Sequence, residues 1–333
     1  MTGENKQASK DASRGALGEA LDRQSGLPTD TIGCAALTSS ETKTEFAISN
    51  WALVAPALIA FASAFWLQAQ APQRELFLTL NHWAAQFPPM LWALFTTLGD
   101  ASVLFCLLSP LLVWRPQLMF AVLAAVPLGG LLSVSLKAAF RAQRPATFIN
   151  PDHFNVIGPL LNNDSFPSGH TISAFAAALA LAATLLVQAR THPAASGRVW
   201  RTSSGLCTLA GMSAIVAFAV VVGFSRVAVG AHWPVDVLAG SACGWLAGVS
   251  GAWAAVRYPK LWQSTISRFV VGQLLLLTAL WLLMKKPQYP QGAPAVWLAA
   301  VCVLVTVIWQ FSAMYRALQA SRNNSTKARS PVV

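Results

Sequence analysis

Long hydrophobic segments dominate this chain and decide the solvent in which it can fold. Eight of them are candidates to cross a hydrocarbon core of about 30 Å. Because a segment in lipid must pair its own backbone polar groups, each is expected to be a helix. The eight segments are Phe46–Leu67, Ala101–Trp114, Leu118–Leu136, Thr171–Val187, Gly205–Phe224, Val235–Val256, Phe269–Met284 and Pro294–Met314.

The composition agrees with a membrane protein and excludes an ordinary soluble domain. Of the 333 residues, 55% are hydrophobic and only 11% are charged, and the mean hydropathy is +0.52. The expected fold class is therefore all-α, a polytopic membrane helix bundle. The stretch Leu76–Leu98 is less apolar and predicts an interfacial helix because it carries Asn81, His82 and Trp83. Asp100 precedes an apolar run and is expected to cap its helix.

Polar stretches flank the hydrophobic part and set the predicted boundaries. Residues 1–45 hold seven of the twelve acidic residues and lack a hydrophobic period, which predicts a disordered tail rather than a signal peptide. The predicted parts are a cytoplasmic tail at 1–45, a six-span core at 46–256, an additional pair of spans at 257–315 and a basic cytoplasmic tail at 316–333.

The distribution of basic residues predicts the orientation. With a cytoplasmic N-terminus and eight crossings, sixteen of the 23 Lys and Arg residues lie in inside segments and seven in outside segments. The formal charge of +11 is spread over many short loops, so no nucleic-acid partner is expected. Four of the seven outside cations, however, belong to the motifs described next, which indicates a role other than topology.

The first motif is a basic segment at the outer end of the third hydrophobic run. Lys137 and Arg144 are seven residues apart and are expected to share one helical face, with Arg141 between them and Pro145 ending the helix. Such a cluster could bind an anion. Taken alone, it could equally be a basic helix end that contacts lipid phosphates.

The second motif is Pro167-Ser168-Gly169-His170, directly before the apolar run that starts at Thr171. A helix N-terminus at this point would present unpaired N–H groups to an anion. Gly169 would allow close approach to the backbone, Ser168 offers a hydroxyl, and His170 can donate a proton near neutral pH. A plain turn and helix cap is the alternative for this motif alone.

The third motif runs from Ser225-Arg226 through His232 to Asp236, with Pro234 in the first turn of the next helix. Asp236 follows His232 by four residues, so it could accept the N–H of one ring nitrogen and leave the other nitrogen free to attack. A carboxylate inside a hydrophobic run indicates a functional site, although a structural His–Asp pair would also explain it. In the charge-based topology all three motifs lie on the same, extracytoplasmic side.

In this order, KX6RP, PSGH and SRX5HX3D resemble the three-part signature of the type 2 phosphatidic acid phosphatase family, which shares its core with vanadium haloperoxidases; every signature position is matched. The resemblance implies that His232 is the nucleophile, that Asp236 orients it, and that His170 protonates the leaving group and then activates water. It also implies no cofactor and no metal, and phosphate binding by Lys137, Arg144, Ser168, Gly169 and Arg226.

The resemblance implies a metal-independent lipid phosphatase in the plasma membrane, such as a bacterial inner membrane, that acts through a phosphohistidine on its extracytoplasmic face. Its expected partner is a phosphorylated lipid: phosphatidate, phosphatidylglycerophosphate, a polyprenyl diphosphate or a lipid A phosphate. Three cationic side chains would also repel a divalent ion. A phosphotransferase with the same site is the alternative, followed by a non-catalytic transporter or scaffold; a soluble-type haloperoxidase does not suit so apolar a chain.

Overall fold

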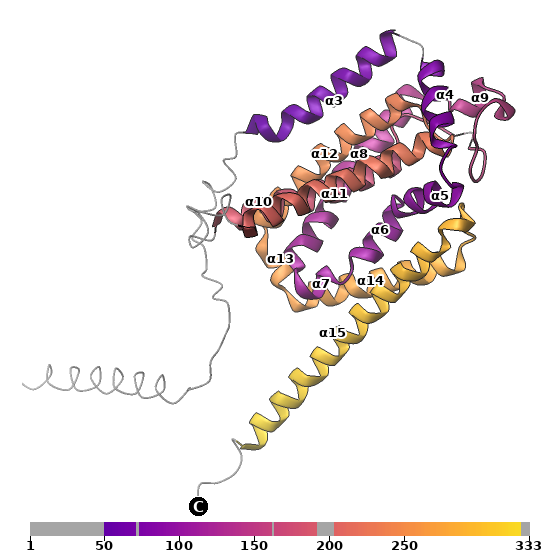
Figure 1. The fold of residues 1–333 in the computed structure, drawn as a ribbon. Helices are drawn as coiled ribbons and strands as arrows, with labels where there is room; N and C mark the ends of the chain where they lie inside the picture. Colours follow the sequence, from indigo (N-terminus) through magenta and orange to yellow (C-terminus); the bar gives the residue numbers. More distant parts are fainter. Residues whose placement is uncertain (1–49, 71–72, 162, 192–202, 328–333) are drawn as a thin grey trace, which may run out of the picture. The chain divides into compact units, whose positions relative to one another are not determined.

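Helices form all of the regular secondary structure among the described residues. The computed structural model describes residues 50–70, 73–161, 163–191 and 203–327, all within the unit Thr42–Val333, so the predicted 1–45 tail lies outside the described residues. The helices, shown in Figure 1, are α3 (Asn50–Gln70), α4 (Gln73–Ala84), α5 (Pro89–Leu98), α6 (Ala101–Leu108), α7 (Leu111–Trp114), α8 (Pro116–Phe140), α9 (Pro145–Phe148), η1 (Pro151–His153), α10 (Gly169–Thr191), α11 (Ser203–Ala228), α12 (Pro234–Arg257), α13 (Pro259–Gln263), α14 (Thr265–Met284), η3 (Pro290–Gly292) and α15 (Ala293–Lys327).

Hydropathy and helix length identify a multi-pass membrane protein. Among the described residues, six segments are long and apolar enough to cross a membrane: Pro116–Phe148, Gly169–Gln188, Ala210–Ala228, Pro234–Arg257, Thr265–Met284 and Pro290–Ala320. The all-α fold class is confirmed, and these six coincide with six of the eight predicted segments. In the region of the predicted segment Phe46–Leu67, the described residues contain a shorter apolar helix, Val54–Trp66.

The prediction of one continuous helix over Ala101–Trp114 is wrong. The chain forms α6 and then a separate short α7, and α6 instead follows α5 at a bend of 73°. The bend lies at Gly99-Asp100, where the Asp100 carboxylate accepts the N–H groups of Ser102 (2.9 Å) and Val103 (3.4 Å). Asp100 is therefore the helix cap that the sequence predicted, and the new N-terminus it stabilises is the reason for the break.

The prediction of one interfacial helix over Leu76–Leu98 also needs correction. The stretch divides into α4 and α5, and Asn81 is fully buried instead of facing a membrane surface. Its amide group donates hydrogen bonds to the carbonyls of Val227 (3.0 Å) and Ala228 (3.2 Å) at the end of α11. A buried amide is stable only when its donors and acceptors are paired, so this polar residue ties α4 to α11.

Helices α10 and α12 pack against each other through backbone-level contact. Gly240, Gly244 and Gly248 lie four residues apart on α12 and face α10. A Cβ atom on Gly244 would lie 2.6 Å from the carbonyl oxygen of Ile172, which is closer than real Cβ contacts. Small residues permit this approach between membrane helices. As a result, the first turns of α10 and α12 lie together, which brings Ser168 next to Asp236, where the Ser168 N–H donates to the Asp236 carbonyl (3.0 Å).

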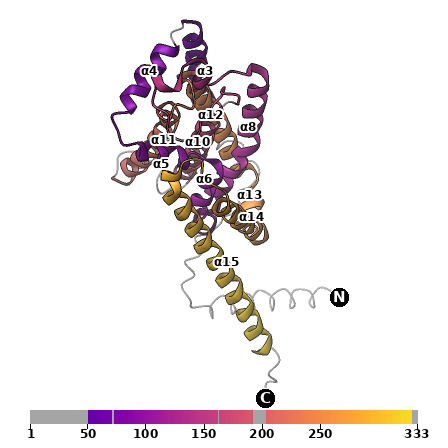
Figure 2. The ribbon, with the colours of Figure 1, turned by 90° about the vertical axis from the view of Figure 1, so that its right-hand side faces the viewer.

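The C-terminal pair α14 and α15 packs against the preceding helices. The two helices contact each other and both contact α6, while η3 contacts α5 (Figure 2). A buried cluster joins Val103 and Cys106 of α6 to Leu275 of α14 and Val303 of α15. The polar segment from Arg316 onward continues α15 as far as Lys327. The connection between α14 and α15 thereby reaches the same end of the bundle as the first turns of α10 and α12.

Candidate active site

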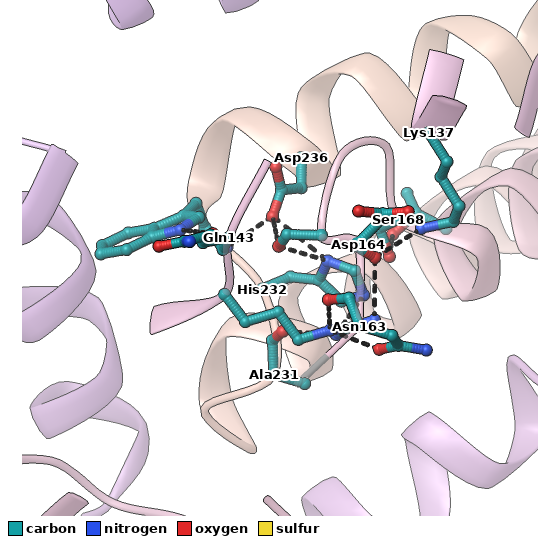
Figure 3. Close-up of polar contacts among 12 residues, drawn as sticks. Lys137, Gln143, Asn163, Asp164, Ser168, Ala231, His232 and Asp236 are labelled. Atoms are coloured by element: carbon teal, nitrogen blue, oxygen red, sulfur yellow. Dashed lines mark hydrogen bonds and ion pairs between the residues drawn. The ribbon is translucent and has the colours of Figure 1, made fainter. Parts of the chain in front are cut away.

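The three sequence motifs converge at one end of the bundle (Figure 3). Lys137 lies in the last turn of α8, Ser168 and His170 lie at the start of α10, and Arg226 lies in the last turn of α11. His232 occupies the connection from α11 to α12, and Asp236 lies in the first turn of α12. The glycine-mediated contact between α10 and α12 holds two of these motifs against each other.

The expected helical face shared by Lys137 and Arg144 does not exist. Helix α8 ends at Phe140, Arg141 takes a left-handed conformation (φ 44°), and Pro145 begins α9 instead of ending α8. Arg144 has extended ψ (163°) because the residue before a proline avoids the α-helical region. Both cations nevertheless reach the Asp164 carbonyl oxygen, Lys137 at 2.9 Å and Arg144 at 3.3 Å, whereas Arg141 is exposed.

His232 and Asp236 form a buried pair at the centre of the site. The Nδ1 atom of His232 lies 3.2 Å from Oδ2 of Asp236, and the two side chains are 2% and 1% exposed. The same Oδ2 accepts a hydrogen bond from the Trp233 N–H (2.9 Å) and another from the Ser165 hydroxyl. Three donors on one oxygen fix the carboxylate, and the carboxylate in turn fixes the ring.

The other ring nitrogen of His232 faces a cation. The Nη1 atom of Arg144 lies 3.1 Å from Nε2 and also donates to the Ala231 carbonyl (2.6 Å). A guanidinium group only donates, so Nε2 accepts and the ring proton lies on Nδ1, toward Asp236. Burial first, and then the charges of Arg144 and Arg226, lower the pKa of His232 well below the ordinary value. The ring is therefore a neutral imidazole whose Nε2 lone pair points at the cationic side of the site.

Arg144 is itself held by the loop that precedes α10. Its Nε donates to the backbone oxygen (3.0 Å) and the side-chain oxygen (2.9 Å) of Asn163. Because the side chain is 6% exposed and carries contacts on Nε, Nη1 and Nη2, its orientation is fixed before any ligand arrives. The loop before α10 therefore positions Arg144 through Asn163, and it also provides Ser165, whose hydroxyl donates to Asp236.

The start of α10 has the geometry expected of an anion site. The helix begins at Gly169, above which a Cβ atom would meet nothing within 4 Å, so there is open space over the first turn. Ser168 is buried, and its hydroxyl accepts a hydrogen bond from the Thr171 hydroxyl (2.9 Å), which leaves the Ser168 proton available for another acceptor. His170 follows in the same turn and is partly buried. Free N–H groups, a hydroxyl and a histidine thus adjoin this space.

Arg226 completes the cationic set. It is 2% exposed, and its Nη1 donates to the Thr96 hydroxyl and to the Tyr289 hydroxyl (3.1 Å). Its Nε is buried without a hydrogen-bond partner among the described residues. A buried unpaired donor on a charged group is costly unless a ligand satisfies it.

Cavities with apolar walls adjoin this polar centre. One, of about 460 Å³, is lined by Phe140, Phe148, Phe166 and Trp233 and reaches Asp236. A second, of about 330 Å³, runs between α6, α8 and α10 and ends at Gly169 and His170. Among the described residues, no three His, Cys, Asp or Glu side chains are placed to hold a metal ion together.

Several residues of the site had no signal in the sequence motifs. Ser165 and Asn163 lie just before Pro167-Ser168-Gly169-His170, so only their proximity to that motif could have drawn attention to them. Thr96 and Tyr289 are remote in the sequence from Arg226 and become visible only in the fold. Of the histidines outside the motifs, His82 and His153 are exposed, and His192 lies outside the described residues.

Comparisons with known proteins agree with the motif positions. The family model of the PAP2 superfamily matches residues 118–262, a range that contains all three motifs. Among solved structures, the crystal structure of LpxE from Aquifex aeolicus matches with 28% sequence identity, over 54% of this chain and 94% of that chain, at a TM-score of 0.43. No curated protein matched the sequence.

Proposed function

We propose that this chain is a membrane phosphatase that removes phosphate from a lipid through a phosphohistidine on His232, since residues 118–262 match the PAP2 superfamily model and contain all three motifs. The observation that carries the proposal is the environment of His232. Asp236 lies on its Nδ1 side at 3.2 Å, and the guanidinium of Arg144 lies on its Nε2 side at 3.1 Å. A neutral imidazole with a hydrogen-bond acceptor at Nδ1 and a cation beside Nε2 suits attack by Nε2 on an anionic phosphoryl group.

In the first step, the Nε2 lone pair of His232 forms a bond to phosphorus as the phosphorus–oxygen bond to the lipid breaks. His170 gives its proton to the leaving oxygen, so the lipid departs as an alcohol. The phosphorylated ring keeps its proton on Nδ1 and becomes cationic. Asp236 stabilises that charge, as its buried carboxylate and its three donors support.

In the second step, a water molecule attacks the phosphorus and returns the site to its starting state. His170, now neutral, takes a proton from the water while the phosphorus–nitrogen bond breaks. The electron pair returns to Nε2 of His232, and inorganic phosphate leaves. In both steps Lys137, Arg144 and Arg226, with Ser168 and the N–H groups at Gly169, hold the non-bridging oxygens. These side chains supply the positive charge that a metal ion would otherwise bring, so the proposed reaction is metal-independent.

Two features support a lipid as the substrate. The site lies at the ends of apolar helices that are long enough to cross a membrane, and two cavities with apolar walls reach it, one at Asp236 and one at His170. Hydrocarbon chains can occupy such cavities while the phosphate sits among the cations. We assign the site to the extracytoplasmic face from the distribution of basic residues, and we retain the organisation of a core at 46–256 with an added pair of spans at 257–315.

The test is phosphate release by the purified protein from a panel of phosphorylated lipids. The panel comprises phosphatidate, phosphatidylglycerophosphate, a polyprenyl diphosphate and a lipid A phosphate. We expect activity to survive a metal chelator, to fall with vanadate, and to disappear in His232→Ala. The exposed His82 supplies the matched control, and His82→Ala should retain activity. Full activity of His232→Ala would contradict the mechanism, and so would loss of wild-type activity in the presence of chelator.

Product analysis separates hydrolysis from the alternative, transfer of the phosphoryl group to another hydroxyl. The two reactions share the first step and differ in the acceptor that attacks the phosphohistidine. Hydrolysis yields free phosphate in an amount equal to the lipid alcohol formed. A phosphorylated acceptor lipid without free phosphate would replace the hydrolase assignment with a phosphotransferase.

A further inference from the structure

The guanidinium of Arg226 is hydrogen-bonded to the protein on one side only among the described residues. Both of its hydrogen bonds to protein groups leave from Nη1, one to Thr96 and one to Tyr289, while Nε is buried without a partner. Both hydrogen bonds therefore lie at Nη1, at one end of the guanidinium. The edge that carries Nε is left for an acceptor that the described residues do not provide. A phosphate oxygen has the charge and geometry to fill that place.

Tyr289 comes from the connection between α14 and α15, outside the residues that the PAP2 superfamily model matches. It is 4% exposed and belongs to a buried cluster with Trp92 of α5 and Ala228 of α11. Its ring also lies against Gly158, where a Cβ atom would come within 2.6 Å of the ring and where φ is +84°. The ring is thus confined on several sides, and its hydroxyl has a defined position.

The connection that carries Tyr289 packs against α5 on its C-terminal side and borders a cavity on its N-terminal side. Toward the C-terminus, η3 contacts α5, and a Cβ atom on Gly292 would lie 3.0 Å from the Ala93 carbonyl oxygen. Toward the N-terminus, Lys285 and Gln288 line a cavity together with His170 and Asp100. The connection is therefore part of the wall of the active site.

We propose that Tyr289 is a positioning residue for catalysis: its hydroxyl oxygen accepts a hydrogen bond from Arg226 and so aims the guanidinium at the phosphate. The inference rests on the proposed function, because it requires Arg226 to bind phosphate. It extends that function by making the α14–α15 pair a component of the active site. A fixed cation stabilises transition-state charge without the cost of reorganising during the reaction.

Tyr289→Phe tests the hydroxyl alone, because the ring and its packing remain. We expect vanadate and inorganic phosphate to bind about tenfold more weakly, as is typical for the loss of one hydrogen bond to a charged group. We also expect kcat for the lipid substrate to fall, while the thermal unfolding temperature stays at the wild-type value. Tyr315→Phe is the matched control, since Tyr315 lies on α15 and is 62% exposed, and all its parameters should equal the wild-type values.

A double-mutant cycle with Arg226→Lys separates positioning from a general structural effect. Lysine has no Nη1 atom, so Tyr289→Phe should cause no further loss of vanadate affinity in that background. The same loss in both backgrounds, or wild-type affinity and kcat in Tyr289→Phe, would overturn the inference. Wild-type activity in Arg226→Lys and in Arg226→Ala would instead overturn the role of Arg226 in the proposed function, whatever Tyr289 does.

Discussion

At the scale of single residues, one carboxylate oxygen organises the centre of the site. Oδ2 of Asp236 lies within hydrogen-bond distance of the ring of His232, the N–H of Trp233 and the hydroxyl of Ser165. His232 and Trp233 belong to the connection before α12, and Ser165 belongs to the loop before α10. The direction of Nε2 therefore depends on contacts that do not touch the substrate.

Ser165→Ala should reduce activity although Ser165 is absent from the signature motifs. Removal of its hydroxyl takes one charge-assisted hydrogen bond from Asp236, so we expect kcat to fall about tenfold to a hundredfold with little change in KM. The measurement is steady-state phosphate release. Ser250→Ala is the control, because the Ser250 hydroxyl donates to the Ala247 carbonyl (2.7 Å) on the same helix, far along the chain from the site. Equal kcat for Ser165→Ala and wild type would contradict a role for this serine.

The sequence predicted the residues that lie at fixed short spacings, and it missed those that the fold brings together. His232 and Asp236 are four residues apart across a helix start, so their contact follows from local geometry. Ser165, by contrast, meets Asp236 through the packing of α10 on α12, and Tyr289 meets Arg226 through the docking of α14 and α15. No periodicity or spacing in the sequence encodes such contacts.

At the scale of helices, the glycines of α12 set the distance between two halves of the site. Gly244→Leu would place side-chain atoms into the backbone of α10, where a Cβ atom alone would lie 2.6 Å from the Ile172 oxygen. We expect a loss of about 1–3 kcal/mol of stability or more, because close-packed helices cannot absorb the added volume. Activity should fall by more than the loss of folded protein explains, because moving α10 away from α12 displaces Ser168 and His170 from His232. Thermal unfolding and phosphate release measure the two effects.

Gly211→Leu supplies the comparison for this substitution. Gly211 lies on α11, is exposed, and a Cβ atom there would meet nothing within 4 Å, so the same change should leave the unfolding temperature and kcat near the wild-type values. If Gly211→Leu and Gly244→Leu lowered stability and activity equally, helix spacing would not be the cause.

Helix ends and breaks were the elements that hydrophobicity predicted least well. The apolar runs located six long helices, because lipid-facing length is written directly into hydropathy. The end of α8 at Phe140 and the bend between α5 and α6 depend on single residues, a left-handed Arg141 and the capping Asp100. The fully buried Asn81 of α4 misled the prediction of an interfacial helix, because a polar residue in an apolar stretch can pair with backbone inside the protein as well as with water.

At the scale of the whole molecule, the orientation derived from basic residues can be measured. In a variant whose native cysteines are replaced by alanine, Asp152→Cys places a thiol on an exposed residue of the connection between α8 and α10, and Lys260→Cys places one on an exposed residue after α12. We expect a membrane-impermeant maleimide to label position 152 in intact spheroplasts and position 260 only after permeabilisation. The reverse pattern would place the site on the cytoplasmic face.

The docking of α14 and α15 also bears on when the protein becomes active during its synthesis. Tyr289 follows the last signature residue, Asp236, by two further helices, so a ribosome completes all three motifs well before it makes the residue that holds Arg226. Until α14 and α15 are inserted and their connection is docked, Arg226 lacks one of its two hydrogen-bond partners. A nascent chain would therefore reach full activity only after its C-terminal helices have entered the membrane.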